Sequence, residues 1–159
     1  MTLTLTPRTE LVAQRSGRLR QHLADAPFDA VLALGIANVD YASGYRSMSG
    51  AVHATSSVAA VLTADRTVLA GPVADSAPAF DAGIADDDFV AFGRFYFESD
   101  GGSAMATRLV DQHADHASAI AEAVHRVGAA AGTVALDDAA CPAPLRAALV
   151  AALPDVRWV

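Results

Sequence analysis

Four residues in the second half of the chain, Asp111, His113, Asp115 and His116, are of the types that bind metal ions in proteins. Two histidines three positions apart on a helix lie on neighbouring sides of one face, and such a pair supplies half of a zinc site. The sequence offers no evident third ligand, and His113 also falls on an apolar stripe that includes Ile120. We therefore expect a solvated helix start with histidines at its rim, and we predict no metal site in this chain.

Three further groups of residues have reactive side chains but lack partners in the sequence. Cys141 precedes Pro142 at a predicted helix start, where a thiol pKa is lowered, yet a nucleophile also needs a base and an orienting group. We expect an inert cysteine or a helix cap. The runs Asp86–Asp88 and Asp137–Asp138 are adjacent in sequence, so their carboxylates do not face one another, and we expect solvated turns. With no G-x-S-x-G, G-x-G-x-x-G or P-loop motif, we predict no catalytic residues in the chain.

The bulk composition limits the classes of partner. A length of 159 residues suits one domain, and the net charge of −7 argues against nucleic acid, whose phosphates require a basic face. A single cysteine excludes an internal disulfide and is typical of a reducing cytoplasm. Residues 1–7 lack the features of a secretory signal, and no apolar run approaches the roughly 20 residues of a membrane span. We therefore expect a cytoplasmic protein with no membrane partner.

Short apolar strands alternate with amphipathic helices along the chain. The helices are predicted at residues 8–25, 73–81, 117–127 and 142–153, the third of them capped by Asp111 or Asp115. The strands are predicted at residues 30–34, 57–63, 67–70, 89–92 or 89–97, 134–136 and 156–159. This alternation predicts an α/β domain of three layers, with helices on both faces of the sheet. A tight turn near Asp65 adds an antiparallel pair, so we expect a mixed sheet of five or six strands.

One segment, Asn38-Val39-Asp40-Tyr41-Ala42-Ser43-Gly44-Tyr45, directly follows the first predicted strand. We predict that Asn38 caps a short helix with its side chain and that Gly44 ends this helix in the left-handed conformation. A loop rich in serine and glycine, residues 46–55, then leads to the predicted hairpin. The segment thus lies between the arginine-rich first helix and an antiparallel pair of strands.

This order of elements resembles the amino-terminal domain of the creatinase, prolidase and aminopeptidase P superfamily, the "pita-bread" metallohydrolases, from about Arg8 to Val159. The resemblance implies that residues 1–159 form one creatinase/prolidase amino-terminal-like domain, with the carboxyl-terminal catalytic domain absent. It further implies a non-catalytic role in a creatinase- or Xaa-Pro peptidase-like hydrolase, contributing to a homodimer and roofing the active site of the parent. The parent would bind two divalent metal ions (Mn, Co or Zn) in the absent domain, or none if it is creatinase-like.

The resemblance also indicates two candidate substrate contacts, Arg46 and His53. In several members of the family, the loop after the Asn-x-x-Tyr motif projects over the active site of the partner protomer, and both residues lie in that loop here. An arginine at this place would bind a substrate carboxylate through two hydrogen bonds, and a histidine would bind it or change charge near neutral pH. The alternative for both is an ordinary solvent-exposed side chain.

Two other functions remain open. A peptidase-like domain without catalysis could act alone as a protein-binding module, and the acidic charge would suit a basic partner. An independent small-molecule enzyme whose site the sequence does not reveal is the third hypothesis. The reading frame of the gene distinguishes them, because a parent hydrolase would continue past Val159 into a domain bearing spaced Asp, Asp, His, Glu and Glu residues. The substrate of the parent, whether an Xaa-Pro peptide, creatine or another amide, stays undecided.

Overall fold

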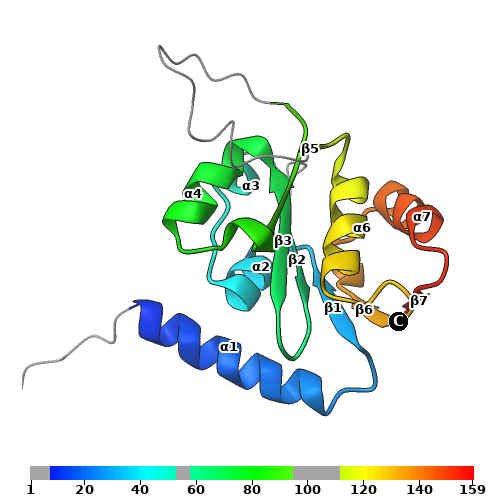
Figure 1. Cartoon of the computed structure of the whole chain (residues 1–159), viewed down its shortest axis with the longest axis horizontal. Coiled ribbons are helices and arrows are strands. Elements are labelled where there is room, and N and C mark those ends of the chain that lie inside the picture. Colours follow the sequence, from blue (N-terminus) through cyan, green and yellow to red (C-terminus); the bar gives the residue numbers. More distant parts are fainter. Residues whose placement is uncertain (1–7, 53–57, 95–111) are drawn as a thin grey trace, which may run out of the picture.

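The structure, a computed structural model, describes residues 8–52, 58–94 and 112–159 (Figure 1). Its helices are α1 (Arg8–Ala24), α2 (Ile36–Ser43), α3 (Met48–Val52), α4 (Ser76–Asp81), α6 (His116–Arg126) and α7 (Ala143–Ala152), with 3-10 turns η1 (Val73–Asp75), η2 (Asp86–Asp88) and η3 (Asp138–Ala140). Its strands are β1 (Ala30–Ala33), β2 (Ala59–Leu62), β3 (Thr67–Pro72), β4 (Phe89–Phe92), β5 (Gln112–His113), β6 (Thr133–Leu136) and β7 (Arg157–Trp158).

All strands of the described residues join one mixed sheet in the order β5-β4-β3-β2-β1-β6-β7. The antiparallel hairpin β2–β3 lies at its centre, and β1 pairs antiparallel with β2 but parallel with β6. The predicted fold class is therefore confirmed. The described part of the sheet has seven strands, more than the expected five or six.

The additional strand is β5, whose residues the sequence had assigned to the region of a helix start. Gln112 and His113 pair parallel with the end of β4 instead. Helix α6 begins only at His116, where Asp115 accepts a hydrogen bond from the Ser118 backbone N–H at 2.8 Å and forms a capping box. Of the two predicted caps, Asp115 is confirmed, whereas Asp111 and residues 95–97 lie outside the described residues.

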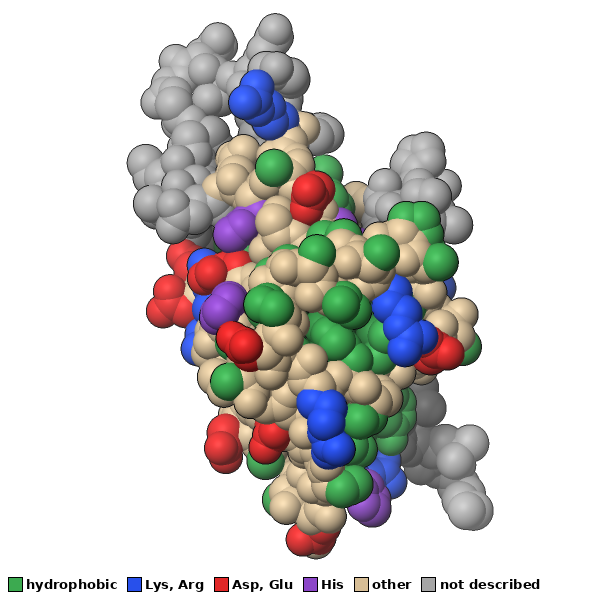
Figure 2. Space-filling model, turned by 90° about the vertical axis from the view of Figure 1, so that its right-hand side faces the viewer, with side chains coloured by type: hydrophobic (Ala, Val, Ile, Leu, Met, Phe, Trp, Pro, Cys, Tyr) green, Lys and Arg blue, Asp and Glu red, His purple; other side chains and the backbone are tan. Residues whose placement is uncertain are grey.

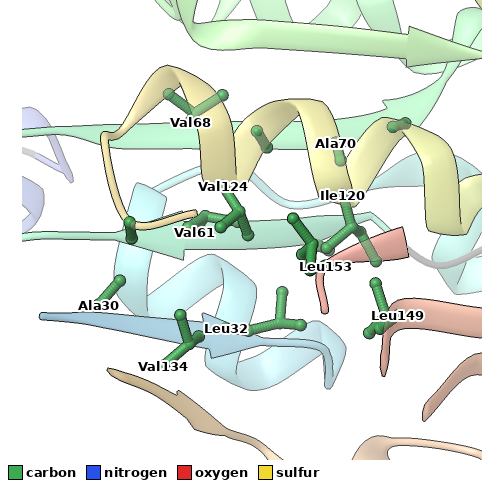
Figure 3. Packing of buried hydrophobic residues seen from close by; sticks show 14 of the residues in the cluster. Ala30, Leu32, Val61, Val68, Ala70, Ile120, Val124, Val134, Leu149 and Leu153 are labelled. Carbon is green, nitrogen blue, oxygen red and sulfur yellow. The ribbon is translucent and has the colours of Figure 1, made fainter. Parts of the chain in front are cut away.

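One face of the sheet is covered by α6 and α7. Alternate residues of the strands, such as Leu32 and Val61, point toward this side and pack with Ile120 and Val124 of α6 and Leu149 of α7 (Figure 3). All five side chains are almost fully buried, and each contributes about 1.5–3 kcal/mol by leaving water. The apolar stripe of α6 is thus used for packing against the strands.

The opposite face carries a second apolar cluster, so the domain has three layers (Figure 1). Here the intervening strand residues, such as Ala33 and Leu69, meet Val39 of α2 and Ala79 of α4. Helix α1 lies against α2 and contributes Leu19 at the edge of this cluster. The motif helix α2 is therefore held between α1 and the sheet.

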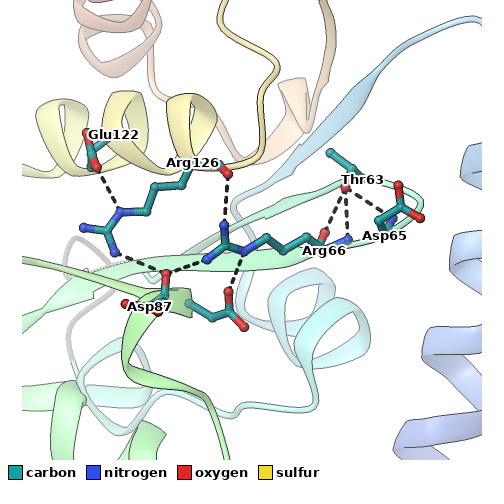
Figure 4. A network of polar contacts seen from close by, with 7 residues as sticks. Thr63, Asp65, Arg66, Asp87, Glu122 and Arg126 are labelled. Carbon is teal, nitrogen blue, oxygen red and sulfur yellow. Dashed lines mark hydrogen bonds and ion pairs between the residues drawn. The ribbon is translucent and has the colours of Figure 1, made fainter.

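A polar network joins the β2–β3 turn to the end of α6 (Figure 4). The Arg66 guanidinium donates to the Asp88 carboxylate at 2.7 Å and to the backbone carbonyls of Asp87 and Arg126 at 2.9 and 3.1 Å. Arg126 in turn binds Glu122 at 2.9 Å. The solvated turn expected at Asp86–Asp88 is the 3-10 turn η2, none of whose residues is buried, and this turn also supplies acceptors to Arg66 from a distant part of the chain.

Candidate functional site

The motif helix α2 is capped differently from the prediction. Gly35 is the N-cap, and no side chain of the helix itself caps it. Asn38 lies inside the first turn and donates its side-chain N–H to the Asp137 carboxylate at 2.7 Å. The same Asp137 oxygen accepts the backbone N–H groups of Leu34 and Gly35 at 3.2 and 3.1 Å. The prediction that Asn38 caps α2 is thus wrong, because Asp137, which follows β6, supplies the anion at this helix start.

The interpretation of the run Asp137–Asp138 as a solvated turn does not hold for Asp137, whose carboxylate accepts hydrogen bonds from Leu34, Gly35 and Asn38. Burial alone would raise the pKa of its carboxyl, but the hydrogen bonds from Asn38, Gly35 and Leu34 outweigh burial, and the pKa lies below its ordinary value. The carboxylate is therefore ionised near neutral pH and ties β6 to the start of α2. Its neighbour Asp138 is exposed and forms an ion pair with Arg146 at 2.6 Å.

The other end of α2 agrees with the prediction. Gly44 adopts the left-handed conformation with φ 75°, and its N–H donates to the Asp40 carbonyl at 2.8 Å. Arg15 of α1 binds the same carbonyl at 3.1 Å, and its guanidinium lies over the Tyr41 ring, 5.3 Å from the centroid. The arginine-rich first helix is thus fastened directly to the motif.

Residues 45–52, which follow Gly44 and are called the platform below, are not a simple loop, because residues 48–52 form helix α3. Ser47 is buried, with 3% of its surface exposed, and its hydroxyl donates to the carboxylate of Asp75, which is 1% exposed. Ser49 donates to the other oxygen of Asp75 with both its hydroxyl (2.5 Å) and its backbone N–H (3.2 Å). The Gly50 N–H closes the platform by donating to the Ser47 hydroxyl at 2.8 Å.

Tyr45 anchors the near end of this platform. It is 3% exposed, and its hydroxyl donates to the backbone carbonyl of Asp75 at 3.3 Å. Burial, together with the charge of Asp75, raises the pKa of Tyr45 above its ordinary value, so the phenol stays protonated and remains a donor. Arg46 therefore stands between two buried neighbours, Tyr45 and Ser47, while its own side chain is exposed.

Arg46 borders a groove of about 550 Å³. The groove is lined by residues of α1, the end of α2, the platform and α4, namely Val12, Ser43, Gly44, Tyr45, Arg46, Met48, Pro78, Asp81 and Ala82. The lining combines apolar side chains with one cation, Arg46, and one anion, Asp81. Such a surface could hold a ligand that carries a carboxylate next to an apolar group. Of the two predicted substrate contacts, Arg46 is exposed at this groove, whereas His53 lies outside the described residues.

Of the four residues considered for a metal, the structure describes His113, Asp115 and His116, whereas Asp111 lies outside the described residues. Within residues 8–52, 58–94 and 112–159, no group of three His, Cys, Asp or Glu side chains could hold a metal ion. His113 lies on β5 and His116 begins α6, where its ring contacts Phe92 with centroids 5.0 Å apart. Burial, together with Asp138 and Asp137, raises the pKa of the Cys141 thiol despite Arg146, which disfavours a thiolate nucleophile there.

The most consequential residue that the sequence did not single out is Asp75. It was assigned to a helix between residues 73 and 81, and the structure confirms η1 and α4 there. No local signal distinguishes it, because its partners Ser47 and Ser49 precede it by 28 and 26 residues. Only the folded chain brings these side chains together.

Solved structures of peptidases share this arrangement of helices and strands. Among solved structures, the chain is similar to an Xaa-Pro dipeptidase from Bacillus anthracis, with a TM-score of 0.61 and 12% identity over 93% of this chain and 33% of that one. It is also similar to the N-terminal domain of the cytoplasmic peptidase PepQ from Mycobacterium tuberculosis H37Rv, with a TM-score of 0.57 and 18% identity over 92% and 91% of the two chains. At these identities the similarity establishes the fold.

A third structure, the Creatinase/Prolidase N-terminal domain of an X-Pro dipeptidase from Streptococcus pyogenes, gives a TM-score of 0.59 and 13% identity over 92% of this chain and 99% of that one. This chain spans about a third of the Bacillus anthracis dipeptidase. No curated protein sequence matches it significantly. None of the helices in the described residues has the length and hydrophobicity that a membrane crossing requires. The model of the Creatinase/Prolidase N-terminal domain family matches residues 15–159, and the chain therefore belongs to this family.

Proposed function

We propose that this chain is the non-catalytic amino-terminal domain of a larger creatinase- or Xaa-Pro peptidase-like hydrolase. The observation that carries the proposal is the family match over residues 15–159, with a chain that covers only a third of a dipeptidase of the same fold. In this proposal residues 1–159 form one domain, and the catalytic residues lie in a carboxyl-terminal domain. That domain would bind two divalent metal ions, or none if the parent is creatinase-like, and the whole protein would be cytoplasmic.

The domain would have two tasks in the parent, to support a homodimer and to cover the active site. Exposed apolar side chains favour an interface, since Met48 is 67% and Leu11 48% exposed. On the side that carries α7 and β7, apolar side chains lie between scattered charges (Figure 2), and Val150 and Val159 are about half exposed. Arg46 would serve the second task by binding a carboxylate of the substrate, and His53 is the other candidate in the same segment.

The proposal can be tested on the purified 159-residue chain and on the gene. We expect no hydrolysis of Xaa-Pro dipeptides or creatine with Mn, Co or Zn added, and turnover above a buffer blank would contradict a non-catalytic domain. The reading frame should continue past Val159 into a domain with spaced Asp, Asp, His, Glu and Glu residues. A frame that stops there would favour the alternative, a stand-alone binding module, whose basic partner the charge of −7 would suit.

Kinetics of the full-length parent test the role of the candidate residues. Arg46→Ala and His53→Ala should each lower kcat/KM with little change in Tm. For Arg46→Ala, the loss of a hydrogen bond to a charged group should reduce kcat/KM roughly 10- to 100-fold. Arg18→Ala is the matched control, because Arg18 is an exposed arginine on α1. An unchanged kcat/KM for both variants would remove the active-site role of this segment.

A further inference from the structure

The Asp75 carboxylate is buried, and it accepts three hydrogen bonds from the platform. One of its oxygens accepts from the Ser47 hydroxyl, and the other accepts from the hydroxyl and the backbone N–H of Ser49. A carboxylate in such a place loses its hydration, which costs several kcal/mol unless hydrogen bonds replace the lost water. Three donors from a three-residue stretch supply that replacement, so the stretch is fixed relative to Asp75.

The backbone at Arg46 is fixed from both sides by this same residue. Tyr45 donates to the backbone carbonyl of Asp75, and Ser47 donates to its carboxylate. Asp75 itself is held at the end of η1, directly after the central strand β3. The exposed Arg46 side chain thus starts from a point that is anchored to the middle of the sheet, although it lies outside any strand.

We infer that Asp75 is a positioning residue for Arg46. Buried polar networks rarely add more stability than apolar side chains of the same volume, and their effect is to select one arrangement. For an arginine that must meet a substrate carboxylate, a displacement of about 1 Å can reduce the rate roughly 100-fold. The inference rests on the proposed role of Arg46 for its effect on catalysis, but the positioning itself is a property of this domain.

Amide hydrogen exchange in the 159-residue chain tests the positioning directly. Asp75→Asn replaces one acceptor with a donor, so exchange at the Ser49 and Gly50 amides should accelerate about 10-fold or more relative to the amides of β3. The Nε–H of Arg46 should show a lower heteronuclear NOE. Ser76→Ala is the matched control, because Ser76 is equally buried and its hydroxyl binds Val73, so neither signal should change.

A second variant guards against a failure of Asp75→Asn to fold. The double substitution Ser47→Ala/Ser49→Ala removes the two hydroxyl donors, leaves only the Ser49 backbone N–H of these three donors on the Asp75 carboxylate, and should produce the same two signals. If both signals stay at their wild-type values in a folded variant, Asp75 does not position Arg46 and the inference is overturned.

A double-mutant cycle in the full-length parent separates this inference from the proposed function. Asp75→Asn should lower kcat/KM roughly 10- to 100-fold when Arg46 is present and should have no further effect in an Arg46→Ala background. Independent losses in the two backgrounds would contradict positioning through Arg46. If the exchange data confirm the positioning but Arg46→Ala leaves kcat/KM unchanged, the proposed role of Arg46 fails and the positioning stands.

Discussion

His116 should make the domain lose stability in mild acid. Its ring contacts Phe92 with an interplanar angle of 31°, and its Nε2 atom is buried without a hydrogen-bond partner among the described residues. Burial disfavours the imidazolium and lowers the pKa of His116 to about 4, although the nearby charge of Asp115 partly opposes the effect. Folding must therefore keep this ring neutral, whereas the unfolded chain binds a proton at the ordinary value near 6.5.

The sign and size of the effect follow from this difference. Because the folded pKa is lowered, the contribution of His116 is fully present above pH 6.5 and is lost as the pH falls toward 4. The two pKa values correspond to about 3 kcal/mol once the pH lies below both, and to about 2 kcal/mol at pH 5. Such a loss is a large share of the 5–15 kcal/mol that is typical of a domain.

Urea denaturation at pH 7 and pH 5 measures the effect. The wild-type chain should lose about 2 kcal/mol more than His116→Phe between these pH values, because phenylalanine keeps an aromatic contact with Phe92 and does not titrate. His125→Gln is the matched control, since His125 lies exposed on the same helix and should leave the loss at its wild-type size. Equal losses in wild type and His116→Phe, or a His116 pKa near 6.5 by NMR, would refute the reasoning.

Two further predictions concern stability at neutral pH. Gly44→Ala should cost about 2–3 kcal/mol, because φ is 75° and a Cβ would lie 2.5 Å from Val12 Cγ1. Gly83→Ala is the control, because Gly83 has φ 93° but open space around it, and it should cost about 1 kcal/mol. If urea denaturation shows equal losses of unfolding free energy for Gly44→Ala and Gly83→Ala, the clash with Val12 is excluded. Arg66→Lys should cost about 1–2 kcal/mol, because the guanidinium reaches its three acceptors from three separate nitrogens, whereas the donors of an ammonium all lie on one nitrogen. Arg146→Lys, in an exposed pair, should change Tm little, and an equally small change for Arg66→Lys would show that the network adds no stability.

The features that could be predicted from the sequence are those set by neighbouring residues. The tight turn at Asp65 indicated the hairpin β2–β3 and hence a mixed sheet, and Gly44 indicated the end of α2, since a left-handed residue without a Cβ is a local requirement. The start of α2 could not be predicted in the same way. Its acceptor, Asp137, lies 99 residues beyond Asn38, and a polar side chain near a helix start is ambiguous until the fold shows which groups surround it.

The candidate site likewise combines features that neighbouring residues set with features that distant residues set. The resemblance of the motif to a known family placed Arg46 in a segment with a possible function, and the structure adds the groove beside it. The sequence described that segment as a loop rich in serine and glycine, whereas Ser47 and Ser49 bind a buried carboxylate and residues 48–52 are helical. From the sequence alone the two serines are indistinguishable from solvent-exposed ones, because their partner, Asp75, comes from a different part of the chain.

The pairing of β1 with β6 has a consequence for how this domain is made on the ribosome. Ala30 lies opposite Val134, so β1 cannot pair with β6 until about 100 further residues have been synthesised. At roughly 5–20 residues per second, this interval lasts from about 5 to 20 seconds. Throughout it, one edge of β1 is unpaired and Leu32 lacks its cover from α6 and α7. The nascent chain therefore exposes an unpaired strand edge that can pair with other chains. Slowing translation between residues 70 and 130 should increase co-translational aggregation.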